Sequence, residues 1–269
     1  MKAFGVHFAY EFRAGLRDRS QLFMNYLFPL LVFLLMASLM SGVNPAFKER
    51  MIPAMSIFAM MSGGLLSLSG ALITQREAGI FRSYGINGVP ARNILLAPAT
   101  ATIAHMAIVS VLIAAMGALV FHAPLPAAFG VYALGWLAAA LATVAFGLAI
   151  GTVMPDPRAG MLASQLVFLP SMMLGGLMFP AEALPRGLGA VSRLLPAHWA
   201  IDAMTSGSIA SAGVPLALAI LLATAILGFA ISLGLFEWHS TPLRKTGPKF
   251  AALGILAPAL AGLGAWLIL

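Results

Sequence analysis

Long apolar stretches separated by short polar segments dominate the hydrophobic pattern of the chain. About 20 apolar residues suffice to cross the hydrocarbon core of a bilayer as an α-helix. The pattern therefore predicts an all-α polytopic membrane protein. The predicted spans cover residues 21–42, 51–74, 97–121, 127–153, 160–178, 214–236 and 250–268. The last of these is short and contains Pro258, so it fits either a seventh span or a re-entrant segment.

Residues 1–20 show helical periodicity instead of a continuous apolar run. Apolar side chains recur every four residues on one face, and basic side chains project from the opposite face. The apolar face holds Phe4, Phe8, Phe12 and Leu16, and the basic face holds Lys2, Arg13 and Arg17. We expect an amphipathic helix lying on the membrane, with a frayed cytoplasmic tail as the alternative. No apolar region precedes the charges, so this is not the pattern of a cleavable signal peptide.

Composition supports the bilayer as the environment of this chain. Of its 269 residues, 61% are hydrophobic and only 9% are charged, far below the charged fraction of soluble domains. The formal net charge of +7 comes from basic residues between the spans, where they indicate topology and lipid contact, not nucleic-acid binding. The chain has no cysteine, which excludes disulfides and thiolate metal sites.

The distribution of Lys and Arg predicts the orientation. With the N-terminus in the cytoplasm, 11 basic residues fall on inner segments and 4 on outer segments, the bias typical of inner loops. The inner set is Lys2, Arg13, Arg17, Arg19, Arg76, Arg82, Arg92, Arg158, Arg244, Lys245 and Lys249; the outer set is Lys48, Arg50, Arg186 and Arg193. We expect a multi-pass protein of the cell (plasma or inner) membrane.

The inner polar segment, 75–97, has the features of a docking element. A charged start is followed by a short helical stretch in which Phe81 and Tyr84, three residues apart, share a face. Gly85 and the Asn87-Gly88 pair end that stretch, and Pro90 suits the first turn of the next helix. A short helix with an aromatic face and charged flanks fits docking to a cytoplasmic partner. A plain positively charged loop is the alternative.

The outer polar segment, 179–214, is divided by Pro180, Pro185 and Pro196. Its pieces are too apolar for a free loop and too interrupted for a span. They suit short helices that dip into the outer leaflet, covered by protein. We expect them to cap the outer end of a pathway, with Trp199 also suited to an interfacial anchor.

No phosphate-binding loop occurs, because the chain contains no Gly-Lys pair. No close pairing of His with carboxylates indicates a metal site, and no residue is predicted to be catalytic. Within the spans, His105 is expected to bond to a neighbouring helix, with a role in a pathway as the alternative. Gly147 and Gly151 form a GxxxG pattern that predicts close helix packing.

Three motifs resemble those of the permease subunits of type-2 ABC exporters, which move drugs, lipids and polysaccharides. The first is Gln75-Arg76-Glu77-Ala78-Gly79 with Pro90, similar to the opening of that family's coupling helix. The second is Gly175-Gly176 and Phe179-Pro180 with Leu184-Pro185. The third is Leu195-Pro196 followed by His198, Trp199 and Asp202. The resemblance covers about residues 1–238, in order.

This resemblance implies a fold, partners and site residues. The fold would be an elbow helix (1–20), a six-helix transmembrane domain (21–238) and outer re-entrant helices, working as a homodimer or heterodimer with two ABC ATPase subunits. Coupling to the ATPase would fall to Arg76, Glu77, Phe81, Arg82 and Tyr84. The outer gate would hold Phe179, Pro180, Glu182, Pro185, Pro196, His198, Trp199 and Asp202.

Two departures from the family pattern stand out. A basic linker (239–249) and an additional apolar segment (250–269) follow the sixth span, where the family usually ends. Ala97-Pro98 stands where the family often has a basic residue at the start of the third span.

Two functions follow from these observations. In the first, the chain is the permease of an exporter of hydrophobic or amphiphilic substrates. It would carry no cofactor of its own, since ATP and Mg would be bound by the partner. In the second, it is an ATP-independent secondary transporter or intramembrane protein. Such proteins usually place several ionisable residues in their spans. Here His105 is nearly alone, and the cargo is not identified by the sequence.

Overall fold

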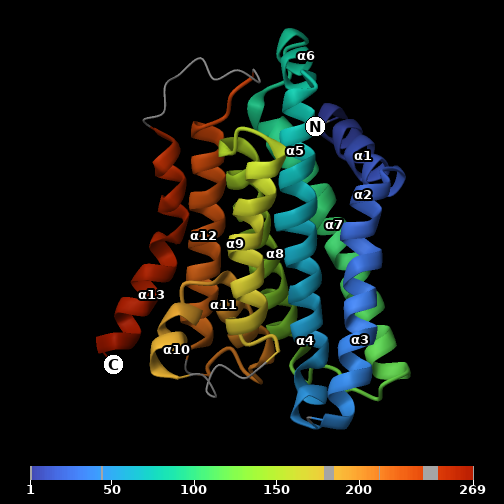
Figure 1. Ribbon diagram of the computed structural model, residues 1–269, viewed down its shortest axis with the longest axis vertical. Helices are drawn as coiled ribbons and strands as arrows, with labels where there is room; N and C mark the ends of the chain where they lie inside the picture. Colours follow the sequence, from blue (N-terminus) through green and yellow to red (C-terminus); the bar gives the residue numbers. More distant parts are fainter. Residues whose placement is uncertain (1, 44, 179–184, 212, 239–247, 269) are drawn as a thin grey trace.

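The computed structural model describes residues 2–43, 45–178, 185–211, 213–238 and 248–268, and every regular element in these ranges is helical. Figure 1 shows long helices side by side, with the N-terminus and α6 at one end and α10 and α11 at the other. We call these the α6 end and the α10 end. The elements are α1 (Lys2–Arg17), α2 (Arg19–Leu22), η1 (Phe23–Leu27), α3 (Phe28–Val43), α4 (Pro45–Met61), η2 (Ser62–Leu68), α5 (Ser69–Glu77), α6 (Ile80–Ile86), α7 (Ala91–Leu119), α8 (Phe129–Val153), α9 (Pro157–Leu174), α10 (Arg186–Ser192), α11 (Pro196–Thr205), α12 (Val214–Gly234), η4 (Pro248–Leu256) and α13 (Ala257–Ile268).

Two continuous helical segments form the centre of the bundle. The segments Phe47–Glu77 and Phe129–Val153 are 78% and 72% buried over their most apolar windows, against 22% for Arg19–Met40. Small residues allow this close approach. Gly147 of α8 lies against the backbone of Gly64 in η2, and Gly151 lies against the side chain of Leu72 in α5. The close packing predicted from the GxxxG pattern is confirmed.

Within the described residues, five helical segments are long and apolar enough to cross a membrane: Arg19–Met40, Phe47–Glu77, Ala91–Leu119, Phe129–Val153 and Val214–Gly234. They match the first four predicted spans and the sixth. The third begins six residues earlier than predicted, because Pro90 precedes the first turn and Arg92 is included in the helix. The Arg92 side chain is exposed at the start of this helix.

The fifth predicted span, 160–178, corresponds to α9, which is not among these five helices. α9 has 18 residues and lies beside α8 in the bundle. It begins after Asp156, which accepts a hydrogen bond from the Ala159 amide, and ends at Gly175. Gly176 has a φ of +84°, a left-handed conformation that ends the helix four residues before the predicted boundary.

Two π-helical segments, η1 and η2, interrupt the helices at the same level. The Ser62 hydroxyl at the start of η2 donates to the carbonyl oxygen of Met24 in η1 at 2.5 Å. The Ser164 hydroxyl of α9 donates to the carbonyl oxygen of Leu65 in η2 at 2.6 Å. These two hydroxyls donate to backbone carbonyl oxygens in the wider turns of the π-helical segments. Such segments often mark functional sites.

The amphipathic α1 is attached to α7 through His105. The His105 ring stacks on Phe12 with ring centroids 4.4 Å apart and planes 4° apart. Its Nδ1 lies 2.6 Å from the Tyr26 hydroxyl of η1. The prediction that His105 bonds to a neighbouring helix is confirmed. The other apolar side chains of α1 do not all face the protein, since Val6 and Tyr10 are largely exposed.

The C-terminal segment lies along α12, and Figure 1 shows it running from the α6 end toward α10. A nine-residue 3₁₀ helix followed by twelve α-helical residues has a length of about 36 Å, against about 30 Å for a hydrocarbon core. Ile255 packs against Gly228 of α12, and Gly262 lies against Trp199 of α11. Residues 252–265 form a shorter apolar helix.

Candidate functional site

The predicted docking segment forms a compact turn between α5 and α7. Gly79 lies between α5 and α6 with a φ of +74°, and Gly88 follows α6 with a φ of +72°. Both positions favour glycine because other residues are strained there. The Val89 amide donates to the Tyr84 carbonyl oxygen at 3.0 Å and ties the end of α6 back to its body. α6 therefore projects from the bundle as a short, fixed helix (Figure 1).

The aromatic face of α6 packs inward. Phe81 is 2% exposed and its ring lies 5.4 Å from the ring of Phe236, after α12. Trp238 covers Gly85 so closely that a Cβ there would lie 2.8 Å from the indole. The segment that follows α12 thus holds one side of α6. The structure places Phe81 in the packing of α6, away from an exposed docking face.

Tyr84, on the same inward face, joins α6 to α1. Its ring makes an edge contact with His7, with centroids 5.2 Å apart. His7 in turn lies 3.3 Å from the carboxylate of Glu11, and the Gln75 amide approaches the same carboxylate at 3.5 Å. Burial raises the pKa of the Tyr84 phenol, and the neighbouring Glu11 and Tyr10 raise it further.

The outward side of this segment combines charge with exposed apolar surface. Glu77 and Arg82 are exposed, as predicted for docking residues. Ile80 is also exposed, and Ile86 is 79% exposed at the end of α6. Sequence reasoning missed Ile86. Its position opposite the Phe81–Tyr84 pair on the same short helix was the available signal. Ile80 and Ile86 thus add apolar surface to the same short helix that exposes Arg82.

Arg76 differs from its neighbour Glu77 because its side chain is buried, at 6% exposure. Its guanidinium donates to backbone carbonyl oxygens at the end of α8 and in the turn that follows. The acceptors are Thr152 at 2.8 Å, Pro155 at 3.3 Å, Gly151 at 3.4 Å and Met154. The last carbonyls of a helix have no partners within it and carry partial negative charge. Arg76 therefore caps α8 and is not on the exposed face predicted for it.

A cavity of about 500 Å³ opens beside this region, between α1–α2 and α9, with η2 and α5 as its floor. Its lining is rich in uncharged polar side chains. These are Ser20, Gln21, Ser67, Ser69, Thr74, Gln75, Ser164 and Gln165, with Asp18 as the charged member and Met24, Leu66 and Met161 among the apolar ones. The volume falls in the range of small-molecule sites.

Gln165 contributes a buried hydrogen-bond acceptor beside this lining. Among the described residues, the Oε1 of Gln165 is buried and has no hydrogen-bond partner. A buried acceptor without a partner is costly unless a ligand or water satisfies it. By contrast, the Ser69 and Ser164 hydroxyls bond to each other at 3.1 Å and to the Leu65 carbonyl oxygen.

At the α10 end, His198 joins α11 to α10 and α9. The Nη1 of Arg193 lies 2.9 Å from its Nε2, and its Nδ1 lies 3.1 Å from the Ser192 hydroxyl. Because a guanidinium only donates, Nε2 accepts and Nδ1 carries the proton. Ser192 then donates to the Leu174 carbonyl oxygen at 2.6 Å. This relay holds the short helices against the end of α9.

The other predicted residues of the outer segment are partly described. Pro196 is buried at the start of α11, and the buried Trp199 donates to the Arg193 carbonyl oxygen at 2.7 Å. The Asp202 carboxylate lies 3.6 Å from the His198 Nε2, and Pro185 precedes α10. The predicted Phe179, Pro180 and Glu182 lie outside the described residues, as do Arg244 and Lys245 of the predicted linker.

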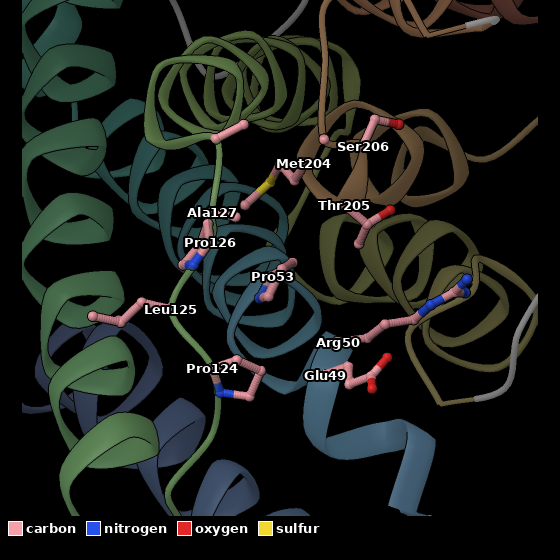
Figure 2. Close-up of a pocket in the computed structure, with 12 residues that line it drawn as sticks. Glu49, Arg50, Pro53, Pro124, Leu125, Pro126, Ala127, Met204, Thr205 and Ser206 are labelled. Atoms are coloured by element: carbon pink, nitrogen blue, oxygen red, sulfur yellow. The ribbon is translucent and has the colours of Figure 1, made fainter.

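A second cavity, of about 350 Å³, opens at the α10 end (Figure 2). It lies where the start of α4, the α7–α8 connection and the end of α11 meet. Glu49 and Arg50 contribute charge, Thr205 and Ser206 contribute hydroxyls, and residues 124–128 contribute a proline-rich wall. The two cavities therefore lie at opposite ends of the bundle.

Comparison with known proteins identifies the family. Searches of curated proteins and of solved structures found no match. The family model described as ABC-2 type transporter matches residues 2–209, which is most of the chain and includes both the α6 segment and α11. Permeases of this family work with an ABC ATPase subunit and are not ATPases themselves. The chain therefore belongs to the ABC-2 type transporter family and is a multi-pass membrane permease component of an ABC transporter.

Proposed function

We propose that this chain exports a hydrophobic or amphiphilic substrate, driven by ATP that a separate subunit hydrolyses. The observation that carries the proposal is the outward face of α6. Its exposed Ile86 ends a helix that also exposes Arg82, while Phe81 and Tyr84 attach the opposite face to the segment after α12 and to α1. A contact helix whose inward face is attached to two other elements transmits displacement to the bundle instead of absorbing it.

The orientation follows from the charges. Among the described residues, the basic ones at the α6 end are Lys2, Arg13, Arg17, Arg19, Arg76, Arg82, Arg92, Arg158 and Lys249, and those at the α10 end are Lys48, Arg50, Arg186 and Arg193. The positive-inside rule then supports a cytoplasmic α6 end and N-terminus. An ATPase in the cytoplasm would reach α6, and the α10–α11 helices would lie on the outer side of the cell membrane.

The cavity beside α9 supports an amphiphilic cargo. Hydroxyl and amide groups line it, and Met24, Leu66 and Met161 add an apolar surface. Such a lining suits a molecule with a polar, hydrogen-bonding part and an apolar part, as in an amphiphilic drug, lipid or glycolipid. Because the cavity lies toward the α6 end, substrate would be loaded from the cytoplasmic side or inner leaflet.

The transport cycle requires a second permease in this proposal. The span Arg19–Met40 and α9 flank the cavity of about 500 Å³ beside α9, which we call the loading cavity. Both expose large apolar side chains, including Leu31, Leu35, Leu162 and Leu166. A second copy or a related permease facing this surface would close a pathway between the two chains, with lipid around the rest. ATP-driven closure of the ATPases would move α6 and open the pathway toward the α10 end.

Co-purification tests the proposal. The gene for a partner ATPase should be expressed with this chain, and the complex purified with a tag on the permease. We expect the wild-type chain to retain the ATPase, and Ile86→Ser or Glu77→Ala to lose it, because each alters the contact face. Ile209→Ser, at an exposed position of the α10 end, is the matched control and should retain it. A purified chain that transports substrate without any ATPase would support an ATP-independent transporter instead.

A further inference from the structure

The guanidinium of Arg76 joins two parts of the chain that carry different roles. On one side it belongs to the last turn of α5, three residues before the left-handed Gly79 that leads into α6. On the other side, the guanidinium donates to four carbonyl oxygens, from the end of α8 into the turn that follows. They belong to Gly151, Thr152, Met154 and Pro155. The next residue, Asp156, caps α9. One side chain thus connects the base of α6 to the α8–α9 turn.

The geometry requires a guanidinium. Its planar fork offers five N–H donors in fixed directions, so that one side chain can reach several carbonyls at once. A lysine ammonium carries three donors on a single nitrogen and cannot spread over the same acceptors.

Close packing already joins α5 to α8 farther along the bundle. Gly151 of α8 contacts the Leu72 side chain of α5, and Gly147 contacts the backbone of Gly64 in the preceding η2. Ser69 and Ile73 of α5 also meet Ser164 and Gly160 of α9, beyond the turn that follows α8. Arg76 extends the connection to that turn, and through it to α9, which forms one wall of the loading cavity.

We propose that Arg76 is the positioning residue that makes the α8–α9 turn move with α6, so that displacement of α6 reaches the wall of the cavity. This inference rests on the proposed function of α6 as the ATPase contact. It assigns to Arg76 a role inside the permease, distinct from contact with the partner. Without the guanidinium, the ATPase would still bind and hydrolyse ATP, but the α8–α9 turn would lose its attachment to the end of α5 and would not follow α6.

Distance measurements between spin labels test this directly, because the chain has no cysteine of its own. Cysteines replacing the exposed Ser83 in α6 and Arg158 in α9 provide the working pair. Cysteines replacing Ser83 and Ile209 provide a reference pair that spans the bundle. Both pairs are measured in the permease–ATPase complex in lipid nanodiscs, without nucleotide and with ADP–vanadate. Transport per ATP hydrolysed is measured on the same variants in sealed proteoliposomes, with a fluorescent, headgroup-labelled phospholipid as the amphiphilic probe.

In the wild type we expect the reference distance to change with nucleotide and the Ser83–Arg158 distance to stay constant. With Arg76→Gln, the Ser83–Arg158 distance should also change when nucleotide binds. Transport per ATP should fall at least about fivefold, the factor that corresponds to the weakest typical coupling between two sites. Arg76→Lys keeps the charge but makes fewer contacts, so its transport per ATP should lie between that of the wild type and that of Arg76→Gln. Arg92→Gln, at an exposed site in α7, should behave as the wild type.

Two results would overturn the inference in distinguishable ways. A constant Ser83–Arg158 distance and normal transport per ATP in Arg76→Gln, with a responsive reference pair, would show that Arg76 does not couple the two parts. A wild-type reference pair that does not respond to nucleotide would show that the proposed ATP-driven function itself is wrong. If Arg76→Gln does not fold, the Arg76→Lys complex decides by the same two criteria.

Discussion

Gly147 of α8 lies against Gly64 of η2 so closely that a Cβ atom at position 147 would overlap the Gly64 carbonyl oxygen. The two central helical segments of the bundle are in backbone contact at this point. In a membrane, where the hydrophobic effect does not drive helices together, such contact is a main source of helix association.

Gly147→Ala should therefore lower stability, because a backbone atom cannot move aside as a flexible side chain can. We expect a loss of about 1–3 kcal/mol, typical of overpacking. Gly130→Ala in the same helix is the control, since a Cβ there meets nothing within 4 Å. Thermal unfolding of the two purified variants checks this. Equal midpoints for Gly147→Ala and Gly130→Ala would contradict the contact.

Gly15 is the position where α1 approaches His105. A Cβ at Gly15 would lie 2.6 Å from the His105 Nε2, so Gly15→Ala should displace the imidazole from Phe12 and Tyr26. The expected result is faster hydrogen exchange of the α1 amides, since α1 loses its attachment to α7. Gly5→Ala, in an open part of the same helix, should leave exchange unchanged. Slow exchange in both variants would show that His105 does not hold α1.

The pH dependence of stability should reveal the burial of Tyr84. Its pKa is raised above the model-compound value of 10.0, so the folded protein keeps the phenol proton at pH values where the unfolded chain has lost it. This contribution to stability is complete below pH 10 and is lost as the pH rises from 10 through the higher folded pKa. Unfolding midpoints measured across this range should fall more steeply for the wild type than for Tyr84→Phe. Parallel curves of unfolding midpoint against pH for the two proteins would contradict the burial of the Tyr84 phenol.

The relay from Arg193 through His198 and Ser192 to Leu174 predicts a cost at the α10 end. Ser192→Ala leaves both the His198 Nδ1–H and the Leu174 carbonyl oxygen without their partner. A buried polar group without a partner costs about 1–3 kcal/mol. We expect Ser192→Ala to lower the unfolding midpoint, and Ser83→Ala, at an exposed position in α6, to leave it unchanged. A neutral Ser192→Ala would argue against the relay.

The sequence was most informative where a local pattern decides the structure. Apolar length located five spans, and Gly147 with Gly151 located a close contact, because both features depend on one helix alone. The end of α9 was missed by four residues, since a left-handed glycine ends a helix without changing the hydrophobic pattern. The membrane interior makes such patterns strong, because every span must satisfy its own backbone.

The candidate site was harder to predict because its residues acquire their environment from distant parts of the chain. Arg76 stands beside Glu77 in a charged run, yet it is buried because the end of α8, about 75 residues later, supplies its carbonyl partners. Phe81 is buried by Phe236, far along the sequence. With these two side chains buried, Ile86 is the most exposed large apolar residue of α6, on the face opposite Phe81 and Tyr84.

ATP-driven transport by this chain depends most on contact between the outward face of α6 and a cytoplasmic ATPase. Single cysteines replacing Ile86, Arg82 and Ile209 can be labelled with a membrane-impermeant thiol reagent in inside-out vesicles, with and without the ATPase subunit. We predict that positions 86 and 82 react in these vesicles and become protected when the ATPase binds. Position 209 should react only in vesicles of the opposite orientation, with no protection. Labelling of position 86 from the outer side, or its full reactivity in the assembled complex, would contradict the account.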